Sequence, residues 1–313
     1  TLSLSVPLRW TGYTGGGFSR ISVNPSLSII YKLNYAWRFT AHASYKERYG
    51  EMTDLYDRPY QTDYRNSVWN CGILPVYRQQ LYSVYGEYKN TAREFFATVN
   101  LTHNREWYNR IYEQRIENGQ VQRVSLPLSN HGSGYTVKST LSKGFYELGL
   151  KTSFLVLLNI SKAEQISGGQ RLPYQYRLMR LEPKVIWTPN RHWETSYQTD
   201  IRYGGNKIGE RTRLAPLWNV TQQVQLSYIF SPIEASLSVD HYHNDVNEDQ
   251  SVNAVFADFS VSWKSGRWQI TTTATNLFDK RTYAYTQYAS LESYTSWVRI
   301  RPREFLVAIR YQL

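Results

Sequence analysis

The stretch "REFLVAIRYQL", which spans Arg303–Leu313, ends the chain on a strictly alternating pattern. Its polar residues Arg310 and Gln312 fall on one face of an extended chain. The apolar residues that share the opposite face are Phe305, Val307, Ile309, Tyr311 and Leu313. Alternation with a period of two residues predicts a β-strand with one apolar and one polar face.

The same alternation recurs from one end of the chain to the other. About fourteen segments show it, and no convincing amphipathic helix interrupts them. The predicted strands are 2–10, 18–33, 36–50, 79–89, 93–110, 132–143, 146–161, 173–188, 191–205, 211–230, 233–245, 252–264, 267–285 and 296–313. Many are far longer than the average of about 5–6 residues for globular strands. A tilted strand needs only about 9–11 residues to cross a membrane.

The predicted connections alternate between tight turns and long segments. Tight turns are expected near 33–37, 88–94, 142–147, 188–193, 230–235 and 264–268, and the long segments are 51–78, 110–131, 162–172 and 286–295. This alternation is typical of an up-and-down outer-membrane barrel, whose short turns face the periplasm. Tryptophans lie beside the tight turns, as in an aromatic girdle: Trp37, Trp187, Trp193, Trp263 and Trp268.

The fold class predicted is therefore all-β, a transmembrane antiparallel up-and-down β-barrel in a single domain over residues 1–313. A soluble propeller or double sandwich is the alternative, but it gives no reason for Trp to gather at one end of the strands. In a barrel the last strand is expected to pair with the first, because closure removes the exposed edge. The final strand would then be a closure element, with Arg310 facing the lumen.

Composition narrows the classes of function. The formal net charge is +11, but Lys and Arg are spread singly along the chain, so we expect no nucleic-acid partner. The longest apolar run is "FLVLL" (Phe154 to Leu158), far short of the ~18 residues of a spanning helix. The single cysteine, Cys71, excludes an intramolecular disulfide.

At its C-terminal end the chain resembles a known family. "NLFDKRTYAY" (Asn276 to Tyr285), in the predicted penultimate strand, and Arg301-Pro302-Arg303 in the last are similar to the C-terminus of TonB-dependent outer-membrane receptors, most of all the Bacteroidetes type. The segment Pro25 to Gly50 also resembles a strand–turn–strand of such barrels.

The resemblance implies import of a scarce nutrient (a siderophore, cobalamin, a glycan or a peptide) across the bacterial outer membrane. Members of the family use a 22-stranded barrel with an N-terminal plug, on which TonB acts. Because about fourteen strands are present and no plug or TonB box precedes Thr1, we expect the chain to be the C-terminal part of a longer receptor. The family's barrels also end more often in Phe than in Leu. The alternatives are a plugless barrel that serves as a structural or assembly partner in an envelope complex, and a passive channel. Expected partners are outer-membrane lipid, TonB through the missing plug, and a surface lipoprotein or other envelope protein.

No residue pattern indicates an enzyme or a cofactor. His241 and His243 alternate on one predicted strand, a spacing that can ligate metal. Polar residues at the end of a membrane strand are ordinary, however, so we expect no metal site. The lumen is expected to carry charges, because Lys or Arg turned to lipid costs about 2–4 kcal/mol at the midplane. The predicted lumen charges are Arg38, Lys46, Arg48, Lys151, Arg202 and Arg310.

Ligand recognition is expected in the long outer loops, where aromatic and Arg side chains gather. Such groups offer stacking faces and paired donors to sugar rings, peptides or carboxylate-rich chelates. The candidate substrate-binding residues are Tyr56, Arg58, Tyr60, Tyr64, Arg65, Trp69, Tyr77, Arg78, Trp107, Tyr112 and Tyr288. An aromatic upper girdle with ordinary loop packing is the alternative reading of this set.

Overall fold

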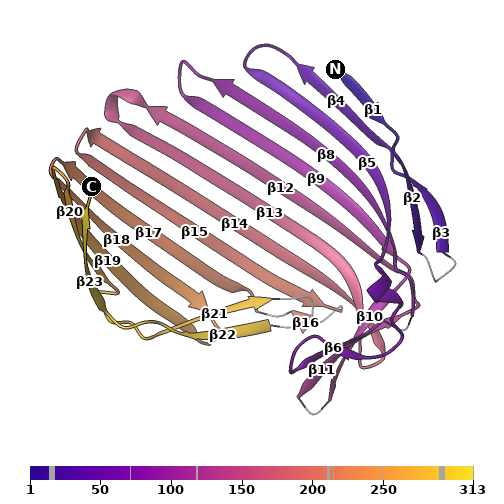
Figure 1. Cartoon of the computed structure of the whole chain (residues 1–313). Coiled ribbons are helices and arrows are strands. Elements are labelled where there is room, and N and C mark those ends of the chain that lie inside the picture. The colour runs from indigo at the N-terminus through magenta and orange to yellow at the C-terminus, as the bar shows by residue number, and fades with distance from the viewer. Residues whose placement is uncertain are drawn as a thin grey trace.

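The computed structural model describes residues 1–13, 18–70, 72–117, 119–209, 212–213, 215–247, 249–288 and 293–312. Most of them form strands of one large curved sheet (Figure 1). Within these residues the helices are two single 3₁₀ turns, η1 (Met52–Leu55) and η2 (Tyr146–Leu148). No helix in the described part of the chain has the length and apolar character needed to cross a membrane.

Fourteen strands of the described residues follow one another antiparallel across the large sheet, as the sequence predicts. They are β1 (Leu2–Ser5), β4 (Ser26–Lys32), β5 (Trp37–Tyr49), β8 (Val76–Asn90), β9 (Phe95–Tyr108), β12 (Asn130–Phe145), β13 (Leu150–Ser167), β14 (Gln170–Asn190), β15 (Trp193–Ile208), β17 (Leu217–Phe230), β18 (Ile233–Asp245), β19 (Ser251–Ser265), β20 (Trp268–Thr275) and β23 (Glu304–Tyr311). All six predicted tight turns join neighbouring strands of this set. The antiparallel up-and-down fold class is therefore confirmed.

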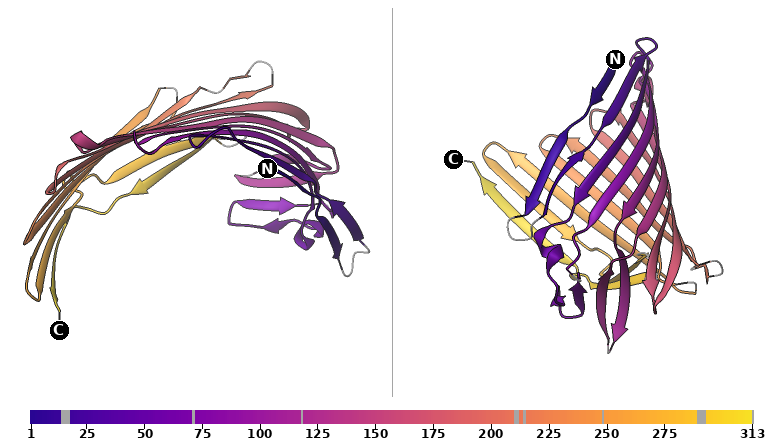
Figure 2. Two further views of the ribbon diagram at one scale, coloured as in Figure 1. Left: turned by 90° about the horizontal axis from the view of Figure 1, so that it is seen from above. Right: turned by 90° about the vertical axis from the view of Figure 1, so that its right-hand side faces the viewer.

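The sheet is an open arc with the two ends of the chain at opposite edges (Figure 2). Along their described residues β1 pairs with β4, and β23 pairs with β20 from Trp268↔Tyr311 to Thr275↔Glu304. The predicted closure of the last strand onto the first is not formed in this arc. The alternating pattern of β23 determines which of its side chains lie on each face of the sheet. It does not determine which strand pairs with the second edge of β23.

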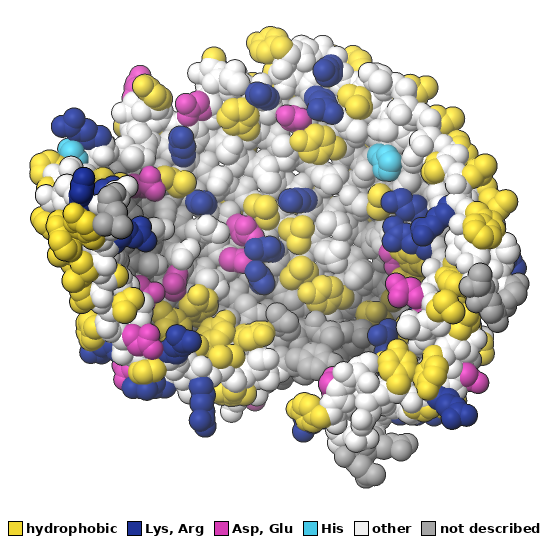
Figure 3. Space-filling view, in the orientation of Figure 1, with side chains coloured by type: hydrophobic (Ala, Val, Ile, Leu, Met, Phe, Trp, Pro, Cys, Tyr) yellow, Lys and Arg dark blue, Asp and Glu magenta, His cyan; other side chains and the backbone are white. Residues whose placement is uncertain are grey.

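The two faces of the sheet differ as a barrel wall requires. One row in register across seven strands is entirely apolar: Ile29, Ala41, Val84, Leu101, Val137, Leu158 and Met179. Val84 and Leu101 are 53% and 48% exposed, which suits contact with lipid and not with water. The opposite, hollow face carries scattered charges of both signs (Figure 3).

The prediction of a long loop at 162–172 is wrong. β13 and β14 stay paired through this segment as far as Ser167↔Gln170. Gly168 and Gly169 make the two-residue turn with φ of 57° and 75°. Gly-Gly is favoured in such hairpin turns because both central residues need positive φ.

The "NLFDK" motif forms a turn between β20 and β21 (Thr282–Tyr288), not part of a strand as predicted. Asn276 and Asp279 have φ of 50° and 52°, and Asn and Asp tolerate that region better than most residues. The Asn276 side chain donates to the carbonyl oxygens of Lys280 and Arg301, both at 2.8 Å. Asp279 accepts from the backbone N–H of Arg303 at 2.9 Å. The two family-like motifs are therefore bound to each other.

The long segments near 51–78 and 110–131 fold against each other as a small sheet, here called the loop sheet. It consists of β6 (Tyr60–Gln61), β7 (Asn66–Trp69), β10 (Ile111–Glu117) and β11 (Gln120–Leu126). β10 and β11 form a hairpin, β7 runs parallel to β11, and β10 runs parallel to the end of β13. Ile111, Val124 and Ser125 are fully buried there. These loops thus have a core of their own.

Three further pieces complete the chain. β2 (Leu8–Tyr13) pairs with β3 (Phe18–Val23), and β21 pairs with β22 (Ser293–Arg299). The short β16 (Thr212–Arg213) pairs with the end of β15. The predicted strands 2–10 and 18–33 are each interrupted near a proline, Pro7 and Pro25, because proline lacks the N–H that a sheet ladder uses.

Candidate ligand site at the loop end

A cavity of about 980 Å³ lies between the loop sheet and the hollow face of the wall. The loop sheet contributes Tyr112 and Arg123, β9 contributes Glu106 and Tyr108, and β14 contributes Tyr174. Glu106 and Tyr108 share a face because they alternate at the end of β9. The loop sheet therefore encloses one end of the lumen-facing surface.

Tyr112 is held between two guanidinium groups. The Arg123 guanidinium carbon lies 3.6 Å from the centre of the Tyr112 ring, and that of Arg110 lies 4.9 Å from it. The register of the hairpin places Tyr112 diagonally across from Arg123. Such stacking is worth about 0.5–2 kcal/mol, depending on desolvation. It leaves the N–H groups at the edge of the Arg123 guanidinium available for other partners.

The two arginines differ in their ionic partners. Arg110 pairs with Asp54 of η1 at 3.0 Å, and this pair links the two loop segments. Arg123 takes part in none of the ion pairs formed within the described residues. Lys162 also lines the cavity without an ion pair to any described residue, but only a guanidinium presents two parallel N–H donors. Arg123 is therefore the cation in this cavity that can best offer paired donors to a carboxylate or phosphate.

Glu106 is fixed by four neutral donors on the hollow face. Its Oε1 accepts from the Tyr77 hydroxyl at 3.1 Å, from the Gln79 amide at 3.1 Å and from the Asn104 amide at 2.9 Å. Its Oε2 accepts from the Tyr108 hydroxyl at 2.9 Å. This network holds the Tyr77 and Tyr108 rings with centroids 5.0 Å apart. The cavity thus has an ordered polar wall opposite the arginines.

Asp63 orders the loop segment at the rim of the cavity. Its Oδ1 accepts from the backbone N–H groups of Arg65 (2.8 Å) and Asn66 (2.9 Å), and its Oδ2 accepts from the Asn66 side chain at 2.7 Å. The hydrogen bond from the Asn66 side chain, followed by that from the Arg65 backbone, lowers the pKa of the Asp63 carboxyl below its ordinary 3.8. Asp63 is consequently ionised at every pH at which the protein would work.

Of the predicted substrate-binding residues, Tyr112 lines the cavity and Tyr77 touches its wall through Glu106. Tyr56 and Tyr60 pack edge to face at 6.0 Å on the loop segment, where Tyr56 is exposed. Tyr64 is exposed as well, with Arg65 5.7 Å from its ring. None of these last four is among the described residues that line the cavity.

The remaining predicted residues lie elsewhere. Arg78 and Trp107 lie on the convex face, where Arg78 pairs with Glu47 at 2.8 Å. Trp69 is half-buried in β7 opposite Val124. Arg58 is exposed in the segment after η1, and Tyr288 is the last residue of β21, with a side chain outside the described residues. Whether any of the eleven binds a ligand stays a prediction.

The predicted lumen charges occupy inward-facing register positions. Lys46 and Arg48 lie in the register rows of Glu106 and Tyr108, but neither is among the described residues that line the cavity. Arg202 pairs with Asp200 at 2.6 Å, and Asp200 also pairs with Arg180 at 3.0 Å. The other three lie in register with partners on neighbouring strands: Arg38 with Glu87, Lys151 with Ile186 and Arg310 with Gln269.

Three residues of the cavity escaped the sequence prediction: Glu106, Arg123 and Tyr174. A signal for Arg123 was present. The dipeptide Asn118-Gly119 between alternating segments is a strong short-range hairpin signal, and a hairpin there brings Arg123 diagonally across from Tyr112. Glu106 and Tyr174 come from strands that only the tertiary fold brings together.

No protein-family model and no curated protein matches the sequence. Solved structures of outer-membrane receptors resemble the fold. The ferric preacinetobactin receptor BauA from Acinetobacter baumannii is 8% identical with a TM-score of 0.50, over 98% of this chain and 55% of that one. The ferric yersiniabactin uptake receptor FyuA from Yersinia pestis is 8% identical with a TM-score of 0.47, over 93% and 50%. The chain thus spans about half the length of these receptors.

At this identity the likeness to BauA concerns the fold alone. The receptors named above do not come from the Bacteroidetes, so they give no support to that finer assignment. The fold class and the outer-membrane location predicted from the sequence agree with these neighbours, which are outer-membrane β-barrel proteins of Gram-negative bacteria. The chain has the fold of an outer-membrane β-barrel wall.

Proposed function

We propose that this chain is part of the barrel of an outer-membrane receptor that imports a scarce nutrient. The observation that carries the proposal is the cavity at the loop end, where an ordered loop sheet faces the hollow side of the wall. A passive channel has no need of a folded cover with its own buried core. A receptor does, because it must hold its ligand before transport.

The chemistry of the cavity supports a ligand with anionic or acceptor groups. Arg123 offers paired donors, Tyr112 a stacking face, and the tyrosines around Glu106 further polar contacts. Siderophores, cobalamin, glycans and peptides all contain such groups. We propose that the protein binds and passes its ligand on unchanged, without acting as an enzyme.

The energy for transport would come from TonB, acting on a plug that the full-length protein supplies. The solved structures with this fold include receptors whose names describe uptake of ferric siderophores, and this supports a TonB partner at the level of the class. A surface lipoprotein over the loop sheet would be a further partner of the same receptor.

Growth under limitation tests the proposal. A deletion strain and a complemented strain of the bacterium that carries the gene are grown with limiting iron, cobalamin, glycan or peptide. We expect the deletion strain to fail on one nutrient class and the complemented strain to recover. Complementation with Arg123→Gln should restore growth only at higher nutrient concentrations. Equal growth of both strains on every limiting nutrient would contradict the proposal.

A further inference from the structure

The convex face carries a row of cations just beyond its apolar band, on the side of the long loops. Arg105 on β9, Lys162 on β13 and Lys207 on β15 fall in one register row, with Ser133 and Gln175 between them. Five neighbouring strands span about 19 Å at the usual spacing. Arg177, two residues from Gln175 on the same face of β14, adds a fourth cation. We call these four residues the basic belt.

The basic belt has few partners within the protein. None of the ion pairs among the described residues involves its four members. Arg105 donates to the ring of His103 at 3.2 Å, and Arg177 makes a long contact of 3.5 Å with Gln175. Positive charge that is not neutralised by the protein can attract an anion.

A hollow of about 290 Å³ lies within the belt. Lys162 and Lys207 line it together with His131, Ser133 and Gln175. Glu164 is the acidic residue among its described lining, and Glu164 pairs with Arg171 at 3.2 Å. The hollow thus presents two ammonium groups and several neutral polar groups, which suits a phosphate group.

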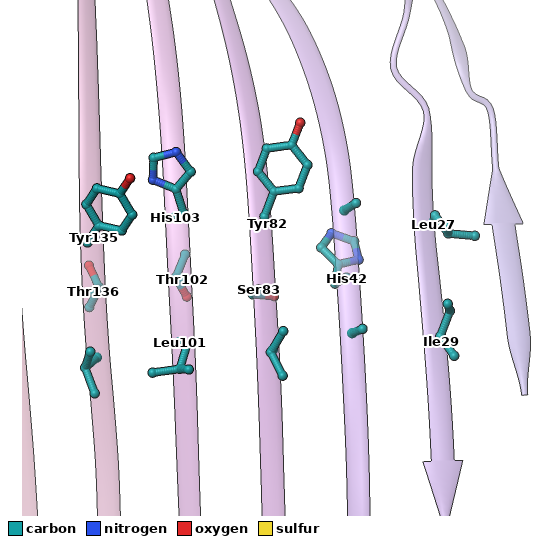
Figure 4. Close-up of a pocket in the computed structure, with 14 residues that line it drawn as sticks. Leu27, Ile29, His42, Tyr82, Ser83, Leu101, Thr102, His103, Tyr135 and Thr136 are labelled. Atoms are coloured by element: carbon teal, nitrogen blue, oxygen red, sulfur yellow. The ribbon is translucent and has the colours of Figure 1, made fainter.

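A larger apolar hollow of about 520 Å³ adjoins the belt on the membrane side (Figure 4). Leu27, Ile29 and Leu101 line it, and its loop-side border is the aromatic row Tyr82, His103 and Tyr135. The His103 ring stacks on Tyr135 at 4.2 Å and on Tyr82 at 6.4 Å. Arg105 follows His103 on the same face of β9, so the apolar hollow leads directly to the basic belt.

We propose that the basic belt and the apolar hollow together bind one phosphorylated lipid of the outer leaflet, of the lipid A type. Its phosphates would contact Lys162, Lys207 and Arg105, and an acyl chain would lie along the apolar hollow. The long loops mark the outer side of the membrane, so the belt is at the height of the outer leaflet headgroups. Lys162, Ser133 and Glu164 line the nutrient cavity as well, whereas Arg105, Arg177 and Lys207 are not among its described lining. Lipid binding is therefore measured in the absence of any nutrient ligand.

Binding is measured with the full-length protein in a neutral detergent. The probes are lipid A with two phosphates and the same lipid after enzymatic removal of the phosphates, and native mass spectrometry counts the bound lipid. Lys162→Gln with Lys207→Gln should weaken binding of the phosphorylated probe about 25-fold, because a basic side chain near an anionic surface contributes roughly fivefold. Lys162→Arg with Lys207→Arg should retain it. Arg191→Gln with Arg267→Gln, at the short-turn end, is the matched control and should not change it.

Each possible result either supports or overturns the proposed lipid site. Tighter binding of the phosphorylated probe, lost in the Lys→Gln pair alone, supports the lipid site. Equal binding of both probes would overturn headgroup recognition. Equal weakening by the Lys→Gln pair and the control pair would show attraction by net charge only, which also overturns the site. Heat-modifiable mobility on gels, measured for every variant, shows that each has folded.

Discussion

The ion pair between Asp54 and Arg110 joins the two segments of the loop sheet, and breaking it should loosen the lid of the ligand cavity. Arg110 directly precedes β10, and Asp54 belongs to η1. Asp54→Asn is the most informative change, because an amide oxygen can still accept the hydrogen bond that Asp54 takes from the backbone of Glu51. The charge is removed while the turn keeps its acceptor.

The magnitude follows from the burial of the pair. The side chains of Arg110 and Asp54 are 12% and 20% exposed. Exposed pairs contribute about 0–1 kcal/mol, and loss of one partner from a buried pair costs about 3–5 kcal/mol. A mostly buried pair at the protein surface should lie between these limits, at about 2 kcal/mol. Local opening of the loop sheet should then be about 30-fold more frequent.

Amide hydrogen exchange of the full-length protein in detergent measures this opening. The amides of Ile111 and Val124, in the core of the loop sheet, should exchange about 30-fold faster in Asp54→Asn. Amides in β14, and in β13 before its pairing with β10 at Ile166 and Ser167, should not change. Arg58→Gln is the control in the same loop segment, since Arg58 is exposed and takes part in none of the ion pairs among the described residues.

A double-mutant cycle separates the pair from other effects of each residue. Arg110 also contacts the Tyr112 ring, so Arg110→Gln removes more than the ion pair. The cycle of Asp54→Asn, Arg110→Gln and both should give a coupling energy of about 1–2 kcal/mol. A coupling energy near zero, or exchange no faster in Asp54→Asn than in Arg58→Gln, would refute the reasoning.

Three further predictions concern the wall and the rim. Val84→Lys should destabilise the protein by about 2–4 kcal/mol in denaturant titrations in lipid vesicles, because Val84 faces lipid. Ser83→Lys, whose side chain lies on the hollow face, should change stability little. Equal effects of the two changes would refute the assignment of faces. Gly149→Ala should prevent folding, seen as loss of heat-modifiable mobility, because φ is 58° and a Cβ would collide with the Thr188 carbonyl. The Asp63 carboxyl should titrate with a pKa below 3.8 in carboxyl NMR. The hydrogen bonds that order the rim should therefore be present above that pH and be lost as pH falls through the lowered pKa. A pKa at the ordinary 3.8 would show that these hydrogen bonds do not form.

The strands were predictable because alternation is local. A lipid-facing residue such as Val84 and its inward-facing neighbour Ser83 differ in polarity, so the two-residue hydrophobic period of a strand is visible in the sequence. Turn chemistry was predictable in principle and was misread twice. Gly168-Gly169 was placed inside a long loop, and Asn276 inside a strand, although both residue types favour the positive φ that they adopt.

The candidate site was less predictable, because it depends on pairings between distant segments. β7 lies beside β11 although more than fifty residues separate them, and β10 lies beside the end of β13. Side-chain composition cannot reveal such parallel contacts. Tyr112 was chosen as one of the aromatic and Arg residues assigned to the long loops. Arg78 and Trp107 were chosen on the same grounds but lie on the convex face.

Energised uptake tests the central claim, that this wall belongs to a nutrient importer, most directly. The nutrient found by the growth panel is radiolabelled and given to cells that carry the full-length protein, with and without TonB. We predict that binding to the cell surface persists without TonB, that entry into the periplasm is lost, and that both are absent from the deletion strain. Uptake that continues unchanged without TonB, or in the deletion strain, would contradict the account.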